Sequence, residues 1–203
     1  MSLPGCGWLL HPSFGADRAA DWRDPARVYI AGTTPAYTAP VTSTEINAPV
    51  TSAEINVDDP RKPEVRALLE RHLTFCLTET PPEHSFALDV SGLLDPAVTF
   101  VSYRDGESVL GVAAIKELDT AHAEIKSMHT AAEARGRGVG RALLSHLIAV
   151  AGSRGYQRLS LETGTTPGFA AARALYESAG FTPTGPFGGY PVTGDNCFYT
   201  RTV

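Results

Sequence analysis

The chain has 203 residues, 43% of them hydrophobic and 19% charged, which suits one ordinary globular domain with a sizeable core. A formal net charge of −5 argues against a general nucleic-acid-binding surface, because the phosphate backbone favours basic patches. Three cysteines without Cys-x-x-Cys spacing suggest neither a disulfide framework nor a zinc site, and without a signal-peptide pattern or a membrane-length apolar run we expect a soluble cytoplasmic protein.

Residues 1–52 differ in composition from the rest of the chain. They are rich in Pro, Gly, Ala and Thr and show no sustained hydrophobic period, and the nine residues Ala39–Asn47 recur with one change as Ala48–Asn56. Two copies of a nine-residue unit cannot build a repeat architecture. We therefore expect a flexible or poorly structured extension over residues 1–52 and a folded domain over residues 53–203. The alternative is a tail that docks a partner or covers the substrate cleft.

The domain is predicted to begin with a strand and two helices. Ile55–Val57 is typical of a short strand, and Asp59 as N-cap with Pro60 in the first position predicts the start of a helix. Its apolar face follows helical spacing, and Pro81-Pro82 ends the region. A short second helix is expected over Asp89–Leu94. The residues of the apolar face are Val65, Leu68, Leu69, His72, Leu73 and Cys76.

Strands and helices then alternate to the end of the chain. Val98–Tyr103 and Ser108–Lys116 predict an antiparallel hairpin whose turn, Arg104–Glu107, has Asp-Gly at its centre. A helix between two further strands implies a crossover with parallel pairing. We therefore expect an α/β (α+β) fold with a mixed, mostly antiparallel sheet, a central parallel strand pair and flanking helices. The later elements are strand Ala121–Thr130, helix Val139–Ala151, strand Arg158–Thr163, helix Pro167–Ala179 and strand Cys197–Thr202.

A glycine-rich run, Arg135–Gly140, lies between a strand and a helix. Three glycines among arginines at a helix start let backbone N–H groups approach an anion, and Arg141 adds a further charge. A nucleoside-triphosphate loop is excluded because no Lys follows these glycines. A dinucleotide loop lacks its third glycine, although Glu162 ends the next strand where such folds hold a ribose-binding acid, so this alternative stays open.

The spacing Arg135-x-x-Gly138-x-Gly140 resembles the acetyl-CoA pyrophosphate loop of the GCN5-related N-acetyltransferase (GNAT) superfamily. A second segment, Ala172-x-x-Leu175-Tyr176-x-x-x-Gly180-Phe181, resembles the last helix of that superfamily. The predicted order of elements is also that of the GNAT fold, and the resemblance covers the chain from Ala53 to its end. Further strings, Glu124–Met128, Leu161–Gly164 and Gly185–Tyr190, are similar to a bacterial subgroup thought to act on small molecules.

The resemblance implies which residues bind acetyl-CoA. The pantetheine arm pairs with the strand before the loop, and the diphosphate binds the loop itself. On the strand, the implied contacts are Ser127, Met128, His129 and Thr130. In the loop and helices they are Arg135, Gly136, Arg137, Gly138, Val139, Gly140, Arg141 and Ala172. Where the superfamily often has Asn, seven positions before its Tyr, this chain has Phe169, which removes one expected contact.

The resemblance also implies two catalytic residues. Tyr176 occupies the position of the thiolate-protonating Tyr, although a helical apolar stripe would also explain it as a core aromatic residue. Glu124 lies eleven residues before Arg135, the spacing of the general base in histone-type members. Strand alternation puts His122, Glu124, Lys126, Met128 and Thr130 on one face, so an ion pair with Lys126 on a solvated face is the alternative for Glu124.

Other groups could accept the proton. Glu162 is the second candidate for the base, and many members use a chain of water molecules instead. His72, His84 and His129 are weaker candidates, because a lone His is more often structural than catalytic.

These features predict an acetyl-CoA-dependent N-acetyltransferase that acts on a small-molecule amine by direct transfer in a ternary complex. The alternative is a non-catalytic acyl-CoA-binding or regulatory interaction module. Substrate contacts are expected from the segments His72–Phe86 and Phe187–Asn196. We expect no metal, no nucleic acid and no membrane as partners, and the sequence allows a homodimer.

Overall fold

A computed structural model of the chain describes residues 53–203. The expectations for residues 1–52, including the first copy of the nine-residue repeat, lie outside the described residues. The predicted domain boundary near Ala53 therefore stays a prediction.

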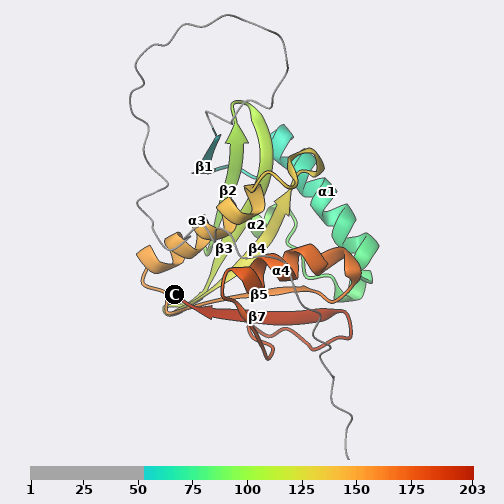
Figure 1. The fold of residues 1–203 in the computed structure, drawn as a ribbon, viewed down its shortest axis with the longest axis vertical. Coiled ribbons are helices and arrows are strands. Elements are labelled where there is room, and N and C mark those ends of the chain that lie inside the picture. Colours follow the sequence, from blue (N-terminus) through green and yellow to red (C-terminus); the bar gives the residue numbers. More distant parts are fainter. Residues whose placement is uncertain (1–52) are drawn as a thin grey trace, which may run out of the picture. The chain divides into compact units, whose positions relative to one another are not determined.

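The described residues form a seven-stranded sheet with the strand order β1-β2-β3-β4-β5-β7-β6 (Figure 1). Each neighbouring pair is antiparallel except β4 and β5, which are parallel. The predicted mixed sheet with one parallel pair is confirmed. The strands are β1 (Ala53–Val57), β2 (Val98–Asp105), β3 (Ser108–Asp119), β4 (His122–Thr130), β5 (Arg158–Gly164), β6 (Thr182–Thr184) and β7 (Asn196–Thr202).

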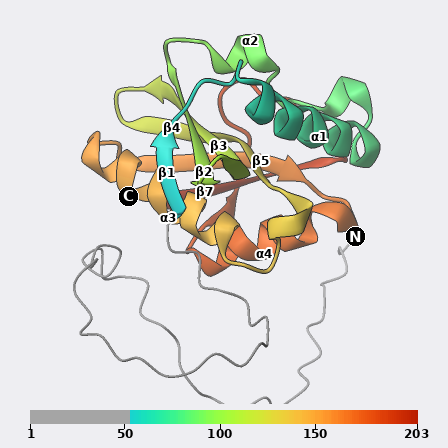
Figure 2. The ribbon, with the colours of Figure 1, turned by 90° about the horizontal axis from the view of Figure 1, so that it is seen from above.

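Helices cover both faces of the sheet. Figure 2 shows α1 (Pro63–Glu79) and α2 (Val90–Leu93) on one face, and α3 (Val139–Ser153) and α4 (Ala170–Ser178) on the other. Helices α1 and α3 both pack against β3, whose central residues Val112, Ala113, Ala114 and Ile115 are fully buried. At Gly111 the approach of α3 is so close that a Cβ would come within 2.8 Å of the Val139 side chain.

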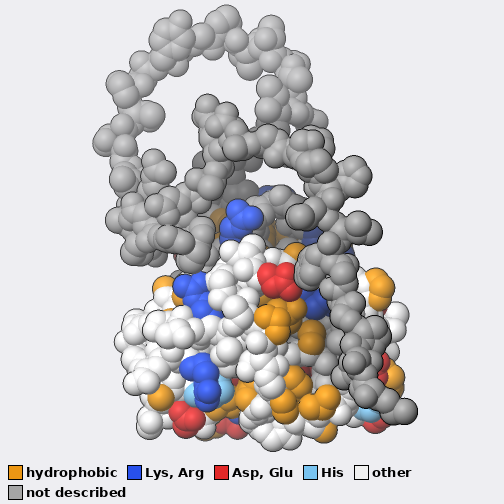
Figure 3. All heavy atoms as spheres, turned by 60° about the horizontal axis from the view of Figure 1, so that its bottom comes forward, with side chains coloured by type: hydrophobic (Ala, Val, Ile, Leu, Met, Phe, Trp, Pro, Cys, Tyr) orange, Lys and Arg blue, Asp and Glu red, His pale blue; other side chains and the backbone are white. Residues whose placement is uncertain are grey.

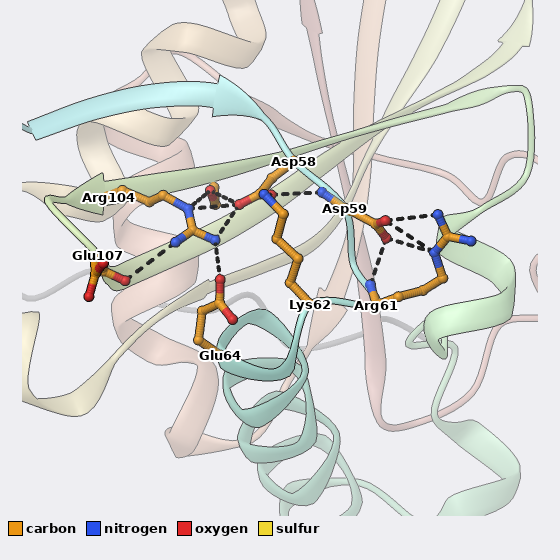
Figure 4. Close-up of polar contacts among 8 residues, drawn as sticks. Asp58, Asp59, Arg61, Lys62, Glu64, Arg104 and Glu107 are labelled. Atoms are coloured by element: carbon orange, nitrogen blue, oxygen red, sulfur yellow. Dashed lines mark hydrogen bonds and ion pairs between the residues drawn. The ribbon is translucent and has the colours of Figure 1, made fainter.

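A buried carboxylate fixes the entry into α1 and moves the predicted helix start. Asp58 has a side chain only 3% exposed, and it accepts hydrogen bonds from Ser102 at 2.6 Å and Arg104 at 2.8 Å (Figure 4). Lys62 pairs with it at 2.7 Å. Asp59 holds the following turn by accepting from the Arg61 amide. The prediction that the helix begins at Pro60 is therefore wrong.

The helix begins at Pro63, with Lys62 as its N-cap residue. Proline is well suited to this first position, because its missing N–H would have no partner inside the helix. The chain has prolines at positions 60 and 63, and the helix starts at the second of them, after the turn in which Asp58 and Asp59 accept backbone hydrogen bonds.

Two details of the sheet also differ from the prediction. The β2–β3 hairpin closes with Asp105 opposite Ser108, so its two-residue turn is Gly106-Glu107, and Asp105 belongs to the strand. Gly106 has a φ of +57°, which favours glycine. The edge strand β6 was not predicted, because it has three residues and contains Pro183, which is compatible with an edge position.

Of the helices in residues 53–203, none has both the length and the apolar character that crossing a bilayer would require.

On the face shown in Figure 3, the basic side chains of the described residues stand apart, with acidic and apolar side chains between them.

Candidate active site

The candidate site is a cleft of about 640 Å³ that opens where the two parallel strands separate. Strands β4 and β5 pair as far as Ile125 opposite Leu161, and no pairing continues beyond this point. The residues that follow on each strand, 126–130 and 162–164, line the cleft. The crossover predicted from the sequence thus brings the ends of β4 and β5 to the same site, together with the first turn of α3 and the start of α4.

A bulge in β4 sets the direction of the side chains along the cleft. Ser127 has a φ of +50° and is the only non-glycine residue with positive φ within residues 53–203. The β3–β4 register shifts at this point, so the alternation predicted for His122 through Thr130 is wrong beyond Lys126. The buried Ser127 hydroxyl has no hydrogen-bond partner among the described residues. Backbone strain and an unpaired buried polar group often mark a functional site.

The glycine loop lies at one end of the cleft and leads into α3. Gly136 and Gly138 have φ values of +73° and +84°, and Gly138 is the N-cap residue. Within the described part of the chain, no acceptor takes a hydrogen bond from the backbone amides of residues 138–141. Four free amides at the positive end of a helix dipole form an anion site.

All the residues predicted to bind the cofactor line this cleft except Arg137, which is exposed outside it. Arg135 and Arg141 line the cleft, and among residues 53–203 neither forms an ion pair. Their charges are available to a bound anion. Ala172 lines the cleft from α4.

Glu162 contributes a carboxyl group with an altered pKa. It is half-buried at the end of β5, and no hydrogen bond from the described residues reaches it. Burial raises the pKa of Glu162 to about 7, with a further increase from Glu124 and a partial decrease from Lys126. A carboxyl group that titrates near neutral pH can accept a proton from an amine and release it again.

Tyr176 lines the same cleft from α4, where its side chain is buried and its ring contacts Phe181. Its hydroxyl has no hydrogen-bond partner among the described residues. Burial raises the pKa of Tyr176 far above its usual value, and the charge of Glu162 adds to the effect. The hydroxyl is therefore protonated at neutral pH and able to donate. Tyr176 has both a place in the core and access to the cleft, so the two readings of the sequence are compatible.

Glu124, the base that the spacing predicted, is not among the residues that line the cleft. Its carboxylate accepts a hydrogen bond from Tyr190 at 2.6 Å and lies 3.4 Å from the Lys126 ammonium. The side chains of Glu124 and Lys126 are only 3% and 7% exposed, so the ion pair expected on a solvated face is buried. Lys126 also donates to the Phe86 carbonyl at 3.0 Å.

The histidine candidates have different environments. His72 and His129 line the cleft with their rings 5.2 Å apart, and burial lowers the pKa of each to about 4. Both are therefore neutral at pH 7 and poor proton acceptors. His84 lies at the edge of the cleft, where it contacts Asp195 at 2.7 Å.

Phe169 stands where the resemblance implied a loss of contact to the cofactor. Its ring lies against Gly164, where a Cβ would come within 2.3 Å of it, and packs edge-on against Phe75 at 5.0 Å. Both rings line the cleft. This aromatic wall was not predicted, since Phe75 is separated from Phe169 by most of the domain.

The segments expected to contact substrate divide between two cavities. Several residues of His72–Phe86 line the cleft, whereas Gly188 to Pro191 line a neighbouring cavity of about 330 Å³. Tyr190 lies in the expected substrate segment Phe187–Asn196, but its hydrogen bond to Glu124 was not predicted. Its position in the string Gly185–Tyr190 was noted, but no local pattern could reveal a partner 66 residues earlier in the chain.

The cleft can thus hold an anion at the loop, take a proton at Glu162 and donate one from Tyr176. Within residues 53–203, no group of three or more His, Cys, Asp or Glu side chains is placed to hold a metal ion. Acid–base chemistry with an anionic cosubstrate is what the arrangement supports.

Comparison with known proteins identifies the family. The acetyltransferase (GNAT) family model matches residues 63–181, more than half of the chain. The chain is 44% identical over 146 residues to the uncharacterized N-acetyltransferase YedL of Escherichia coli (strain K12), covering 72% of this chain and 92% of the relative. It is 43% identical over 147 residues to the uncharacterized N-acetyltransferase YsnE of Bacillus subtilis (strain 168), covering 72% and 97%.

The fold agrees with this assignment. A crystal structure from Klebsiella pneumoniae subsp. pneumoniae MGH 78578, provisionally assigned as an acyl-CoA N-acyltransferase, has a TM-score of 0.64 and 26% identity. The likeness covers 76% of this chain and 99% of that chain. The chain belongs to the acetyltransferase (GNAT) family, whose members use acetyl-CoA, and it is an acyltransferase.

Proposed function

We propose that the protein transfers the acetyl group of acetyl-CoA to the amine of a small molecule, with both substrates bound together. One observation carries the proposal: a single cleft holds free loop amides, a carboxyl group with a pKa near 7 and a tyrosine hydroxyl without a partner. The amides would bind the diphosphate of acetyl-CoA, the carboxyl group would accept the proton of the amine, and the hydroxyl would protonate the departing thiolate.

The loop residues are suited to the diphosphate of acetyl-CoA. The amides of residues 138–141 and the cations of Arg135 and Arg141 would bind its oxygens, and the absence of side chains at Gly136 and Gly138 allows close approach. The edge of β4 beyond Ile125 has no partner on the β5 side, and it can pair with the pantetheine amides as a further strand would.

Glu162 is the base that we propose in place of Glu124. Glu162 faces the cleft and titrates near neutral pH, whereas the carboxylate of Glu124 is held by Tyr190 and Lys126. The amine nitrogen attacks the thioester carbonyl carbon and the nitrogen loses its proton to Glu162. As the carbon–sulfur bond breaks, the Tyr176 hydroxyl gives its proton to the departing thiolate.

A covalent acyl-enzyme is disfavoured by the state of the cysteine in the cleft. Cys76 lies beside His72, but burial raises the pKa of its thiol to about 11. At neutral pH this thiol is protonated and is a weak nucleophile. Direct transfer from the bound thioester to the amine needs no such intermediate.

The proposal is tested by following thiol release from acetyl-CoA with a panel of amino acids, polyamines and aminoglycosides. We expect turnover with at least one of these amine classes, and calorimetry should show binding of acetyl-CoA but not of NAD. Tight NAD binding with no acetyl-CoA binding would contradict the assignment of the loop. Release of thiol at the same rate with and without every amine would contradict the assignment of an amine acceptor.

A further inference from the structure

A second cavity shares part of its lining with the cleft. It has a volume of about 330 Å³ and lies between the loop before α2, strands β3 and β4, and the loop before β7. Phe86, Ala87 and Lys126 line both cavities, and the Lys126 ammonium donates a hydrogen bond to the Phe86 carbonyl where the cavities meet. A molecule that reached from one cavity to the other would pass this side chain.

The charged side chains that line this cavity carry a net positive charge. Lys116, Glu124 and Lys126 line it, which gives two ammonium groups and one carboxylate. Lys126 is the cation that the carboxylate balances, because it lies 3.4 Å from Glu124 and also donates to Tyr190. The surplus positive charge belongs to Lys116.

Lys116 is left without a partner by the geometry of the sheet. It lies directly opposite Glu124 in the β3–β4 register, so the two side chains project from the same face. The Glu124 carboxylate is turned toward Tyr190 and Lys126, and within residues 53–203 no acid lies within ion-pair distance of the Lys116 ammonium. The next acid along β3, Glu117, projects from the other face and accepts from Tyr156.

The cavity wall opposite the sheet contains no acidic residue that could balance the charge of Lys116. Gly188 and Gly189 have φ values of +59° and +84°, conformations that glycine adopts readily. They bring the Tyr190 ring against Phe86, with centroids 5.2 Å apart. A partly buried ammonium without an ion-pair partner, at the side of a cavity that is open to solvent, can bind an anionic group.

We propose that this cavity binds the carboxylate of the acetyl acceptor, so that the substrate is an amino acid-like molecule with its amine in the cleft and its carboxylate at Lys116. This inference rests on the proposed function for the position of the amine, but the anion site itself does not. It favours acceptors that carry a negative charge over polyamines and aminoglycosides, which carry only positive charge.

The test compares ω-amino acids with their carboxamides, which have the same length and shape but no negative charge. The series is β-alanine, γ-aminobutyrate and ε-aminocaproate, each paired with its amide, and kcat/KM is measured by thiol release from acetyl-CoA. We expect one member of the series to exceed its amide at least tenfold. Similar kcat/KM values for acid and amide at every length would overturn the inference while leaving the proposed function intact.

Variants of Lys116 test whether the preference for the ω-amino acid over its carboxamide arises in this cavity. Lys116→Gln should bring the acid-to-amide ratio close to one, mainly through KM, and Lys116→Arg should restore most of the preference. Arg66→Gln is the matched control, because Arg66 is an exposed cation on α1 that lines neither cavity. An acid preference that is unchanged in Lys116→Gln would contradict the assignment of the site.

Binding of the acetylated products separates this inference from the proposed function. N-acetyl-γ-aminobutyrate and N-acetyl-ε-aminocaproate are titrated calorimetrically into the protein in the presence of CoA. Binding that falls at least tenfold in Lys116→Gln supports the carboxylate site even if no amine is turned over, a result that would overturn only the proposed function. Absence of binding to wild-type protein by both products would overturn the carboxylate site.

Discussion

Asp58 has a buried carboxyl group and Glu162 a half-buried one, and their environments shift the pKa in opposite directions. Burial alone would raise the pKa of Asp58, but hydrogen bonds from Lys62, Ser102, Arg104 and the Asp59 amide outweigh it and hold the pKa well below its usual range (Figure 4). Glu162 receives no such bond, and burial raises its pKa to about 7. The number of donors around a carboxyl group, rather than its burial, distinguishes the structural acid from the candidate catalytic one.

The two groups also couple folding to pH with opposite signs. The folded-state pKa of Asp58 is depressed, so its contribution to stability is present above about pH 4 and is lost as the pH falls toward the folded value. The folded-state pKa of Glu162 is raised, so the folded state favours the protonated form. Stability from Glu162 is therefore greatest below its ordinary pKa of 4.5 and declines as the pH rises through about 7.

The largest effect is expected from Glu162→Gln. Without a base in the cleft, kcat should fall by roughly 10²- to 10⁴-fold. In the wild type, kcat/KM should rise with pH, reach half of its maximum near pH 7 and level off above it, and this limb should be absent from the variant. Because the variant removes a buried carboxyl group without donors, its thermal stability should not decrease, and it should lose the decline of stability between pH 5 and 7.

Glu124→Gln decides between the two acids. It should weaken the network with Tyr190 and Lys126 and raise KM for the acceptor, but the limb near pH 7 should remain. Loss of this limb in Glu124→Gln together with its retention in Glu162→Gln would restore Glu124 as the base.

The next largest effect is expected at the structural carboxylate. Asp58→Ala leaves the Arg104 cation without its buried partner, and we expect the free energy of unfolding to fall by about 3 kcal/mol. Urea denaturation measures this loss, and kcat per folded molecule should not change. Asp59→Ala is the matched control, because Asp59 pairs with Arg61 in solvent and should have a much smaller effect. Equal losses in the two variants would contradict the assignment of Asp58 as the structural acid.

Tyr176→Phe should have an intermediate effect on activity. It removes only the hydroxyl, so a fall of about 10²-fold in kcat, the lower end of the range for a general acid, is expected, with KM for acetyl-CoA nearly unchanged. The Tyr176 ring still fills its place beside Phe181, and thermal stability should be close to wild type. Unchanged turnover would remove Tyr176 from the mechanism and leave it as a core aromatic residue.

The sequence predicted the parts of this molecule that depend on local patterns. Apolar periodicity located α1 and α3, and the strand–helix–strand order predicted the parallel pair that opens the cleft. The glycine run could be placed at the start of α3 because glycine spacing and helix start signals are both local. These features depend on residues within a few turns of one another.

The features that the sequence could not predict depend on distant partners. Asp58 moves the start of α1 because Ser102 and Arg104 reach it from β2, more than forty residues later. Glu124 is turned away from the cleft by Tyr190, from a loop near the end of the chain. The pKa of Glu162 is raised because the group is partly buried and receives no hydrogen bond from the described residues. No sequence pattern indicates that such donors are absent. Serine likewise gives no signal for the positive φ that forms the bulge at Ser127.

The smallest effect is expected at the two ends of α3, where alanine variants of two glycines distinguish an effect on backbone conformation from an effect on acetyl-CoA binding. Gly138 and Gly155 flank the two ends of α3 with φ values of +84° and +78°, and a Cβ at either would meet no atom within 4 Å. Alanine at each position should therefore cost about 1 kcal/mol of stability, for the same conformational reason.

Only Gly138→Ala should also weaken acetyl-CoA binding, because the methyl group and a relaxed φ would both disturb the free amides of residues 138–141. Calorimetry with acetyl-CoA on the two variants measures the difference. Equal affinities at equal stability would mean that the loop amides do not hold the diphosphate, whereas a loss confined to Gly138→Ala would place the binding energy in the backbone at the start of the helix.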